Sequence, residues 1–206
     1  MRTKFTTVLT VLVAIIMLAI TTQTSIAAEN NQVTKLTEIK NISKVTATGN
    51  VEVFLSQGAT EGVTVYNKYY SENALVQLED GELRITSYGT EKLQVWVQVD
   101  QLGSIEANGN AEIRSLNRIS ALNLSVTLND SSTAILNTAT VTSDAQVNDA
   151  STLSLTGSAE DHSLTISGTA KVDVTNFDSA TSSLNSEGAG KLVVTRNGKN
   201  VIIQKV

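Results

Sequence analysis

The second half of the chain repeats a short turn at a nearly constant spacing. Five four-residue turns, each with Gly or Asp at its second position, begin at Asn108, Asn129, Asn148, Ser167 and Glu187. Measured at the second position, the steps between them are 21, 19, 19 and 20 residues. A short apolar strand follows each turn. A fixed period in this range is typical of stacked, solenoid-like folds, so the repeat constrains the fold of the chain far more than its function.

Period-two alternation of apolar and polar residues predicts short strands from Val45 onward, for example over residues 93–99 and 122–128. No window after the N-terminal segment has the apolar stripe of a helix. Apolar residues of successive repeats also fall into two columns: Leu116, Leu136, Leu155, Val174 and Val194, and Val126, Ala145, Leu164 and Leu184. We therefore predict an all-β, single-domain, right-handed parallel β-helix with coils of roughly 20 residues, each contributing two or three short strands.

Stacked coils would place the turn residues Asn108, Asn129 and Asn148 above one another. Their side chains would then form a ladder of hydrogen bonds along the stack. The Gly or Asp beside each of them tolerates the left-handed backbone that a tight corner needs. The chain has no proline, which agrees with central strands that need every amide. The first half is less regular: residues 62–85 are typical of hairpins with a turn at 79–82, and the sequence leaves open whether this half follows the same winding.

The N-terminus has the order of a secretory signal peptide. Arg2 and Lys4 precede an apolar run over 8–20, and small residues follow up to Ala28. The run is too short to span a membrane comfortably, so no membrane span is expected in the mature chain. We divide the sequence into a signal peptide over 1–28, a leader over 29–42 and the β-helical domain over 43–206. The protein is thus expected to be exported, to the periplasm or to the cell surface and medium.

Composition excludes several classes of function. The formal charge is -5 and becomes -7 when Arg2 and Lys4 are removed, which argues against nucleic acid as a partner. The chain has no cysteine, so thiolate metal sites and cysteine nucleophiles are excluded. Aromatic residues make up 4% of the chain, with one tryptophan, fewer than a stacking platform for sugars or bases normally uses.

Few residues suggest chemistry. His162 is the only histidine. Its column with Leu124, Ser143 and Ser182 places it at a coil corner, where a structural or solvent-exposed histidine is expected rather than a catalytic one. Five aspartates raise the alternative of calcium, although turn formation explains them more simply: Asp130, Asp144, Asp149, Asp161 and Asp173. Arg114, Arg118, Lys171, Lys191 and Arg196 are scattered, whereas a polysaccharide-acting β-helix enzyme needs clustered carboxylates and bases. We predict no catalytic, metal or cofactor-binding residue, and the ligand-binding residues are unknown at this stage.

The first half carries a resemblance to a known family. The segments 49–58, 79–85 and 95–99, followed by Leu102, Ile105 and the turn at 108–113, occur in an order that resembles the head domain of putative auto-transporter adhesins, the GIN domain, a bacterial family of unknown function. The resemblance covers roughly residues 40–205 and implies a right-handed parallel β-helix, an envelope or surface location and no established catalytic residues. The chain departs from the family in its Asn-Asp and Ser-Gly turns, and Asp100-Gln101 stands where a proline is common.

These observations predict an exported, non-enzymatic envelope or cell-surface protein that acts as an adhesin-type binding module. Its partner would be a glycan or a protein at the cell envelope, held by many weak contacts along a rigid polar face. The alternative is a periplasmic structural or assembly protein, and a polysaccharide-acting enzyme is a further one. An open end of the stack also allows a homo-oligomer.

Overall fold

The computed structural model describes residues 33–36, 39–66, 74–188, 191–196 and 199–204, with the backbone alone for the last two ranges. All of them belong to one compact unit, Asn31–Val206. The signal peptide predicted for residues 1–28 lies outside the described residues. The limits predicted for the leader and the main domain stay predictions, although part of the leader forms a strand of the sheet.

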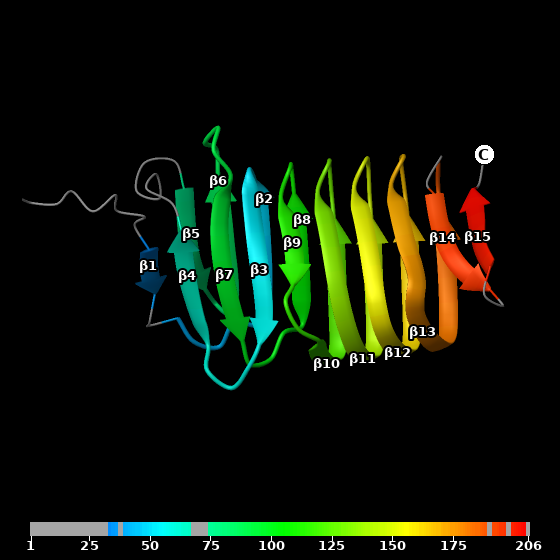
Figure 1. Cartoon of the computed structure of the whole chain (residues 1–206), viewed down its shortest axis with the longest axis horizontal. Helices are drawn as coiled ribbons and strands as arrows, with labels where there is room; N and C mark the ends of the chain where they lie inside the picture. Colours follow the sequence, from blue (N-terminus) through cyan, green and yellow to red (C-terminus); the bar gives the residue numbers. More distant parts are fainter. Residues whose placement is uncertain (1–32, 37–38, 67–73, 189–190, 197–198, 205–206) are drawn as a thin grey trace, which may run out of the picture. The chain divides into compact units, whose positions relative to one another are not determined.

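Fifteen strands of the described residues form one mixed sheet (Figure 1). In chain order they are β1 (Val33–Leu36), β2 (Lys44–Gly49), β3 (Val51–Gln57), β4 (Gly62–Tyr66), β5 (Ala74–Glu79), β6 (Glu82–Ser87), β7 (Leu93–Val99), β8 (Ser104–Asn108), β9 (Glu112–Ser115), β10 (Ile119–Leu128), β11 (Thr133–Val147), β12 (Thr152–Ile166), β13 (Lys171–Ser186), β14 (Lys191–Arg196) and β15 (Lys199–Gln204). No helix long and apolar enough to cross a membrane occurs in this part of the chain.

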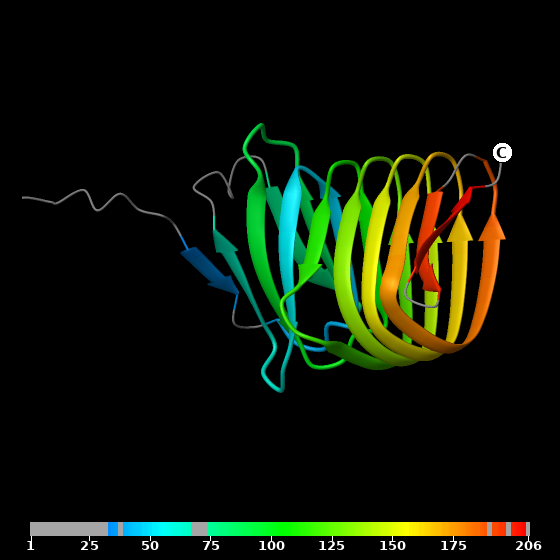
Figure 2. The ribbon, with the colours of Figure 1, turned by 45° about the vertical axis from the view of Figure 1, so that its right-hand side comes forward.

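The sheet folds over into an open half-barrel with two walls (Figure 2). The first wall contains β4, β7, β3, β9 and the first parts of β11 to β13, and the second wall contains β6, β2, β8 and the last parts of β10 to β13. Buried and partly exposed residues alternate along most strands, as in β3 and β7. The apolar side of each wall therefore faces the other wall, and one continuous cluster of side chains from Ile39 to Val172 fills the space between them.

The repeat sets the register of β10 to β13, which pair in parallel. Val126 pairs with Ala145, Ala145 with Leu164, and Leu164 with Leu184, so this predicted column is confirmed. The other column holds only in part. Leu136 does pair with Leu155, but Leu116 is 56% exposed and lies outside the core.

The prediction of a right-handed parallel β-helix is wrong. In the first half, spatial order departs from chain order, because β3 lies between β7 and β9, and β2 lies between β6 and β8. Later coils contribute one long bent strand of 15 or 16 residues, such as β11 or β13, instead of two or three short ones. A parallel β-helix and this half-barrel show the same alternation and the same repeat period. Neither pattern specifies which strands become neighbours, so the sequence could not distinguish the two folds.

Antiparallel pairs occupy both ends of the sheet and make it mixed. β1, β4 and β7 pair antiparallel at one end of the first wall, and β14 and β15 pair antiparallel at the other. β5 and β6 form the hairpin predicted for residues 79–82, with Glu79 opposite Glu82. Asp80 and Gly81 have φ of 49° and 81°, the left-handed backbone of a tight two-residue hairpin turn.

Candidate functional site

The predicted asparagine ladder is present along the upper rim of the second half. Asn129 donates from Nδ2 to Asn108 Oδ1 over 2.7 Å, and Asn148 donates to Asn129 Oδ1 over 2.9 Å. Ser167 continues the ladder by donating from Oγ to Asn148 Oδ1 over 2.9 Å. Because every amide already has a partner within the ladder, it joins the coils and leaves few groups for a ligand.

The residue after each ladder position has a left-handed backbone. The φ angles are 70° for Gly109, 62° for Asp130, 58° for Asp149, 67° for Gly168 and 88° for Gly188. The Asp130 carboxylate accepts the Gly109 N–H at 2.8 Å, and that of Asp149 accepts the Asp130 N–H at 3.0 Å. Each of these two aspartates thus has a backbone N–H donor from the preceding coil, so turn formation accounts for its position.

The remaining aspartates give no support to a calcium site. The Asp173 carboxylate accepts the N–H of Thr175 at 2.9 Å, and Asp161 is exposed. Among the described residues, no group of three or more acidic or histidine side chains could hold a metal ion. Turn and strand capping therefore accounts for the aspartates whose contacts are known.

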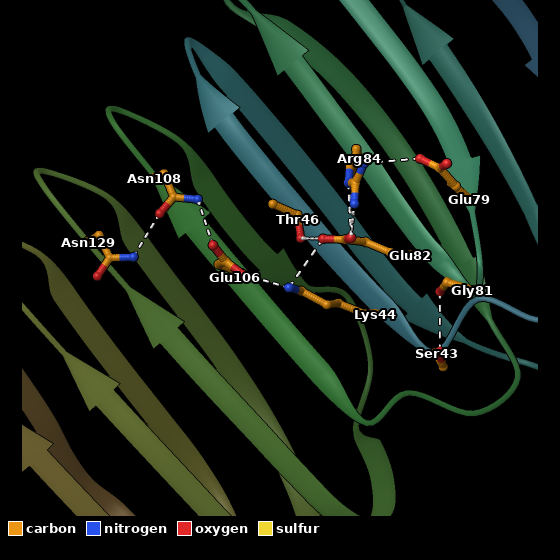
Figure 3. A network of polar contacts seen from close by, with 10 residues as sticks. All are labelled: Ser43, Lys44, Thr46, Glu79, Gly81, Glu82, Arg84, Glu106, Asn108 and Asn129. Carbon is orange, nitrogen blue, oxygen red and sulfur yellow. Dashed lines mark hydrogen bonds and ion pairs between the residues drawn. The ribbon is translucent and has the colours of Figure 1, made fainter.

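A charged network lies on the outer face of the second wall (Figure 3). Lys44 of β2 forms ion pairs with Glu82 of β6 at 3.2 Å and with Glu106 of β8 at 2.7 Å. Arg84 binds Glu82 at 2.7 Å, and the Thr46 hydroxyl donates to Glu82 at 2.6 Å. The network links three neighbouring strands across their outer surface.

The electrostatics of this network oppose acid catalysis. Hydrogen bonds from Thr46, Arg84 and Lys44 lower the pKa of Glu82 from 4.5 to about 2. The hydrogen bond from Lys44 likewise lowers the pKa of Glu106, and the bond to Glu106 raises that of Lys44. A general acid needs a raised carboxyl pKa, so these groups are permanently charged partners that position one another.

His162 lies in the core row of the second wall, so of the structural and exposed positions expected for it the structural one is confirmed. It pairs with Ser143 of β11 and Ser182 of β13 and is 7% exposed. Its ring packs against Phe177 with centroids 4.9 Å apart. Burial lowers its pKa, an effect that the Ser143 backbone and Asp144 offset in part. The imidazole is therefore a neutral, packed side chain at pH 7.

A groove of about 940 Å³ crosses the lower bends of the long strands. Its lining comes from successive strands and is mostly small, and it includes Ala121, Leu122, Thr140, Val141, Ala159 and Glu160. Glu160 is the one charged residue of this lining, so the groove lacks the paired carboxylates of a glycosidase. The Thr140 hydroxyl is buried without a hydrogen-bond partner.

Three aromatic side chains gather on the outer face of the first wall, although they are far apart in the sequence and no motif joins them. Phe54 of β3 stacks on Trp96 of β7 with centroids 4.3 Å apart and planes at 26°. Tyr66 of β4 meets Trp96 edge-on at 4.4 Å and is 42% exposed. We call these three residues the aromatic cluster. Each of the three occupies a position where the alternation of its strand expects a polar residue. An aromatic residue at such a position is the sequence signal that could have revealed the cluster.

A strip of hydrogen-bonding groups borders the aromatic cluster. Gln94, beside Trp96 on β7, donates to Glu52 at 2.9 Å, and Arg114 of β9 approaches Glu52 to 3.6 Å. Arg114 also forms an ion pair with Glu112. The other carboxylate oxygen of Glu112 lies 3.2 Å from Lys92 Nζ. An apolar cluster of rings, with Tyr66 its most exposed member, thus lies next to amide, carboxylate and guanidinium groups that are paired with one another.

Comparison with known proteins now places the chain in a family. The profile described as "Putative auto-transporter adhesin, head GIN domain" matches residues 41–202. The chain belongs to this family, as its resemblance suggested. A comparison with curated proteins finds no match.

Solved structures of bacterial proteins share the fold. A putative adhesin from Bacteroides fragilis aligns with a TM-score of 0.69 at 15% identity, over 78% of each chain. A putative adhesin from Parabacteroides distasonis gives 0.61 at 14% identity, over 79% of this chain and 80% of that one. A putative lipid binding protein from the same organism gives 0.54 at 12% identity, over 78% and 80%. At such identities the likeness establishes the fold alone.

Proposed function

We propose that this protein is an exported, non-enzymatic adhesin-type binding module that recognises a glycan at the cell envelope. The observation that carries the proposal is the aromatic cluster with its polar border. The C–H groups of a pyranose ring would pack against the exposed part of the cluster, chiefly Tyr66. Its hydroxyls would share the hydrogen-bonding groups of Gln94, Glu52 and Arg114, which are held in place by their contacts with one another. Membership of the GIN domain family supports an adhesin-type role.

The geometry favours an extended glycan over a small molecule. Phe54, Trp96 and Tyr66 come from three adjacent strands, so the cluster runs across the strands of the first wall. Such a surface contacts several sugar units weakly and gains affinity by summing those contacts or by avidity.

Binding to a panel of immobilised and soluble polysaccharides tests this proposal. The chain has one tryptophan, so the fluorescence of Trp96 reports directly on the cluster. We expect a saccharide to change that fluorescence, and Tyr66→Ala to weaken binding at least about tenfold. Tyr88→Ala is the matched control, because Tyr88 is a lone aromatic, 84% exposed, on the loop after β6. The proposal fails if no saccharide binds or if both tyrosine variants lose binding equally.

Export and display form the second part of the proposal. Protease treatment of intact cells, with a periplasmic marker as control, is expected to degrade the protein and spare the marker. Protection until the outer barrier is opened would favour the alternative, a periplasmic structural or assembly protein. The strand β13 supports this alternative. Residues 176–185 pair with β12 on one side, and among the described residues no strand pairs with their other side. An open strand edge is suited to pairing with another chain.

A further inference from the structure

The outer edge of β13 is open in the second wall. β12 covers one side of β13 from the pair Thr156–Asn176 to the pair Ile166–Ser186. On the other side, β14 pairs only with residues 171–173. Figure 2 shows β13 as the last strand of the second wall. Among the described residues, no strand pairs with the far side of residues 176–185.

The backbone of this segment directs unused hydrogen-bonding groups outward. The Glu187 N–H bonds to Ile166 O on β12 at 2.8 Å. In a parallel pair, alternate residues direct both N–H and C=O toward the same neighbour. Ser183 and Asn185 therefore bond toward β12, whereas Ser182 and Leu184 direct their N–H and C=O groups to the open edge.

The composition of the edge lacks the usual protection against pairing. Residues 179–186 contain neither a charged residue nor proline, which are the devices that normally block edge association. Leu184 is 42% exposed, whereas Val126, Ala145 and Leu164 of the same row are at most 3% exposed. The apolar row of the core therefore ends uncovered at this strand.

We propose that a second copy of this chain covers the edge, with β13 pairing antiparallel to its own counterpart about a two-fold axis. A two-fold interface presents the same segment on both sides. Residues 179–186 of β13 carry no charge, so this segment meets its own copy without repulsion although the chain carries a formal charge of -5. The pairing would bury Leu184 and double the number of binding faces.

Self-association of the purified protein, followed by sedimentation or light scattering over a wide range of concentration, tests the proposal. We expect a dimer that is weakened at least about tenfold by Ser182→Pro, which removes an outward N–H and leaves the bonds to β12. Ser183→Lys is also expected to weaken the dimer, because it places a positive charge on each side of the two-fold axis. Ser163→Lys is the matched control, because Ser163 pairs with Ser183 one strand further in, and it should leave the dimer intact.

Cysteine cross-linking locates the interface independently of stability. The chain has no cysteine, so a cysteine introduced singly at positions 181–185 is the only thiol. An antiparallel two-fold pair brings at least one of these positions opposite its own copy, and oxidation should join the chains there, whereas Ser163→Cys should stay unlinked. A protein that is monomeric at every concentration, a dimer unaffected by both edge variants, or equal cross-linking of Ser163→Cys would overturn the proposal.

Discussion

Gly157 carries the strongest local constraint in the long strands. It lies within β12 with φ of +107°, and a Cβ there would come within 1.9 Å of the Thr138 carbonyl oxygen. Because the obstacle is backbone, no rotamer change can relieve it. We expect Gly157→Ala to lower the free energy of unfolding by about 2–4 kcal/mol in urea titrations. Gly62→Ala is the control, since a Cβ there meets nothing within 4 Å; equal effects of the two variants would contradict the argument.

The lowered pKa of Glu82 predicts how the stability of the fold depends on pH. Its pKa is about 2 in the folded protein against an ordinary 4.5, so the unfolded chain binds the proton more readily. The stabilisation is fully present above pH 4.5 and is lost as the pH falls toward 2. We expect Glu82→Gln to flatten the fall of the urea midpoint across this window. Glu160→Gln, an exposed substitution of the same kind, should leave the slope unchanged, and a slope altered equally by both would remove Glu82 from the explanation.

At the scale of elements, Asn129 tests whether the ladder holds the coils together. Its amide donates to Asn108 and accepts from Asn148, so Asn129→Ala leaves two partners unsatisfied. We expect a loss of about 1–3 kcal/mol in unfolding free energy and faster hydrogen exchange in the turns at residues 108–111 and 148–151. Asn110→Ala, at an exposed position of the neighbouring turn at residues 108–111, should change neither quantity. A ladder variant as stable as this control would show that strand pairing alone sets the register.

The repeat made some of these elements predictable from sequence. The nearly constant spacing of 21 and 19 residues predicts Asn108, Asn129 and Asn148 in one row. The left-handed corner and the row from Val126 to Leu184 follow from the same spacing. Leu116 failed this test because β9 ends at Ser115, before the row is reached. Local periodicity therefore predicted register wherever the strands are consecutive in the chain.

Strand order and the aromatic cluster needed the structure. Alternation assigns a residue to one side of its strand, but it does not specify the neighbouring strand. Phe54 and Trp96 are 42 residues apart in sequence and become neighbours because β3 pairs with β7. The low aromatic content argued against a stacking platform, yet the fold gathers three rings on one face. The count of aromatic residues was thus a weaker guide than their placement.

In the first half of the chain, strands that are distant in sequence lie between one another in the sheet. This interleaving affects how the whole molecule unfolds. The strand pair β2–β3 comes early in the chain but lies between β6–β7 and β8–β9 in space. Loss of any of these pairs would expose its neighbours on both sides, and one core cluster continues from them into the long strands. In a sequential solenoid, terminal repeats unfold independently of distant ones. Interleaving and a shared core favour a single cooperative transition instead.

Gly157→Ala makes this cooperativity measurable, because its site in β12 and the reporter Trp96 in β7 belong to different halves of the chain. If the protein unfolds as one unit, the variant should shift the urea midpoint of Trp96 fluorescence by as much as the midpoint of far-ultraviolet circular dichroism. Gly62→Ala should shift neither. If the circular dichroism curve of Gly157→Ala instead splits in two while the Trp96 midpoint stays in place, the long strands unfold separately. The two halves would then be coupled by contact alone, and the interleaved strands would not confer cooperativity on the whole.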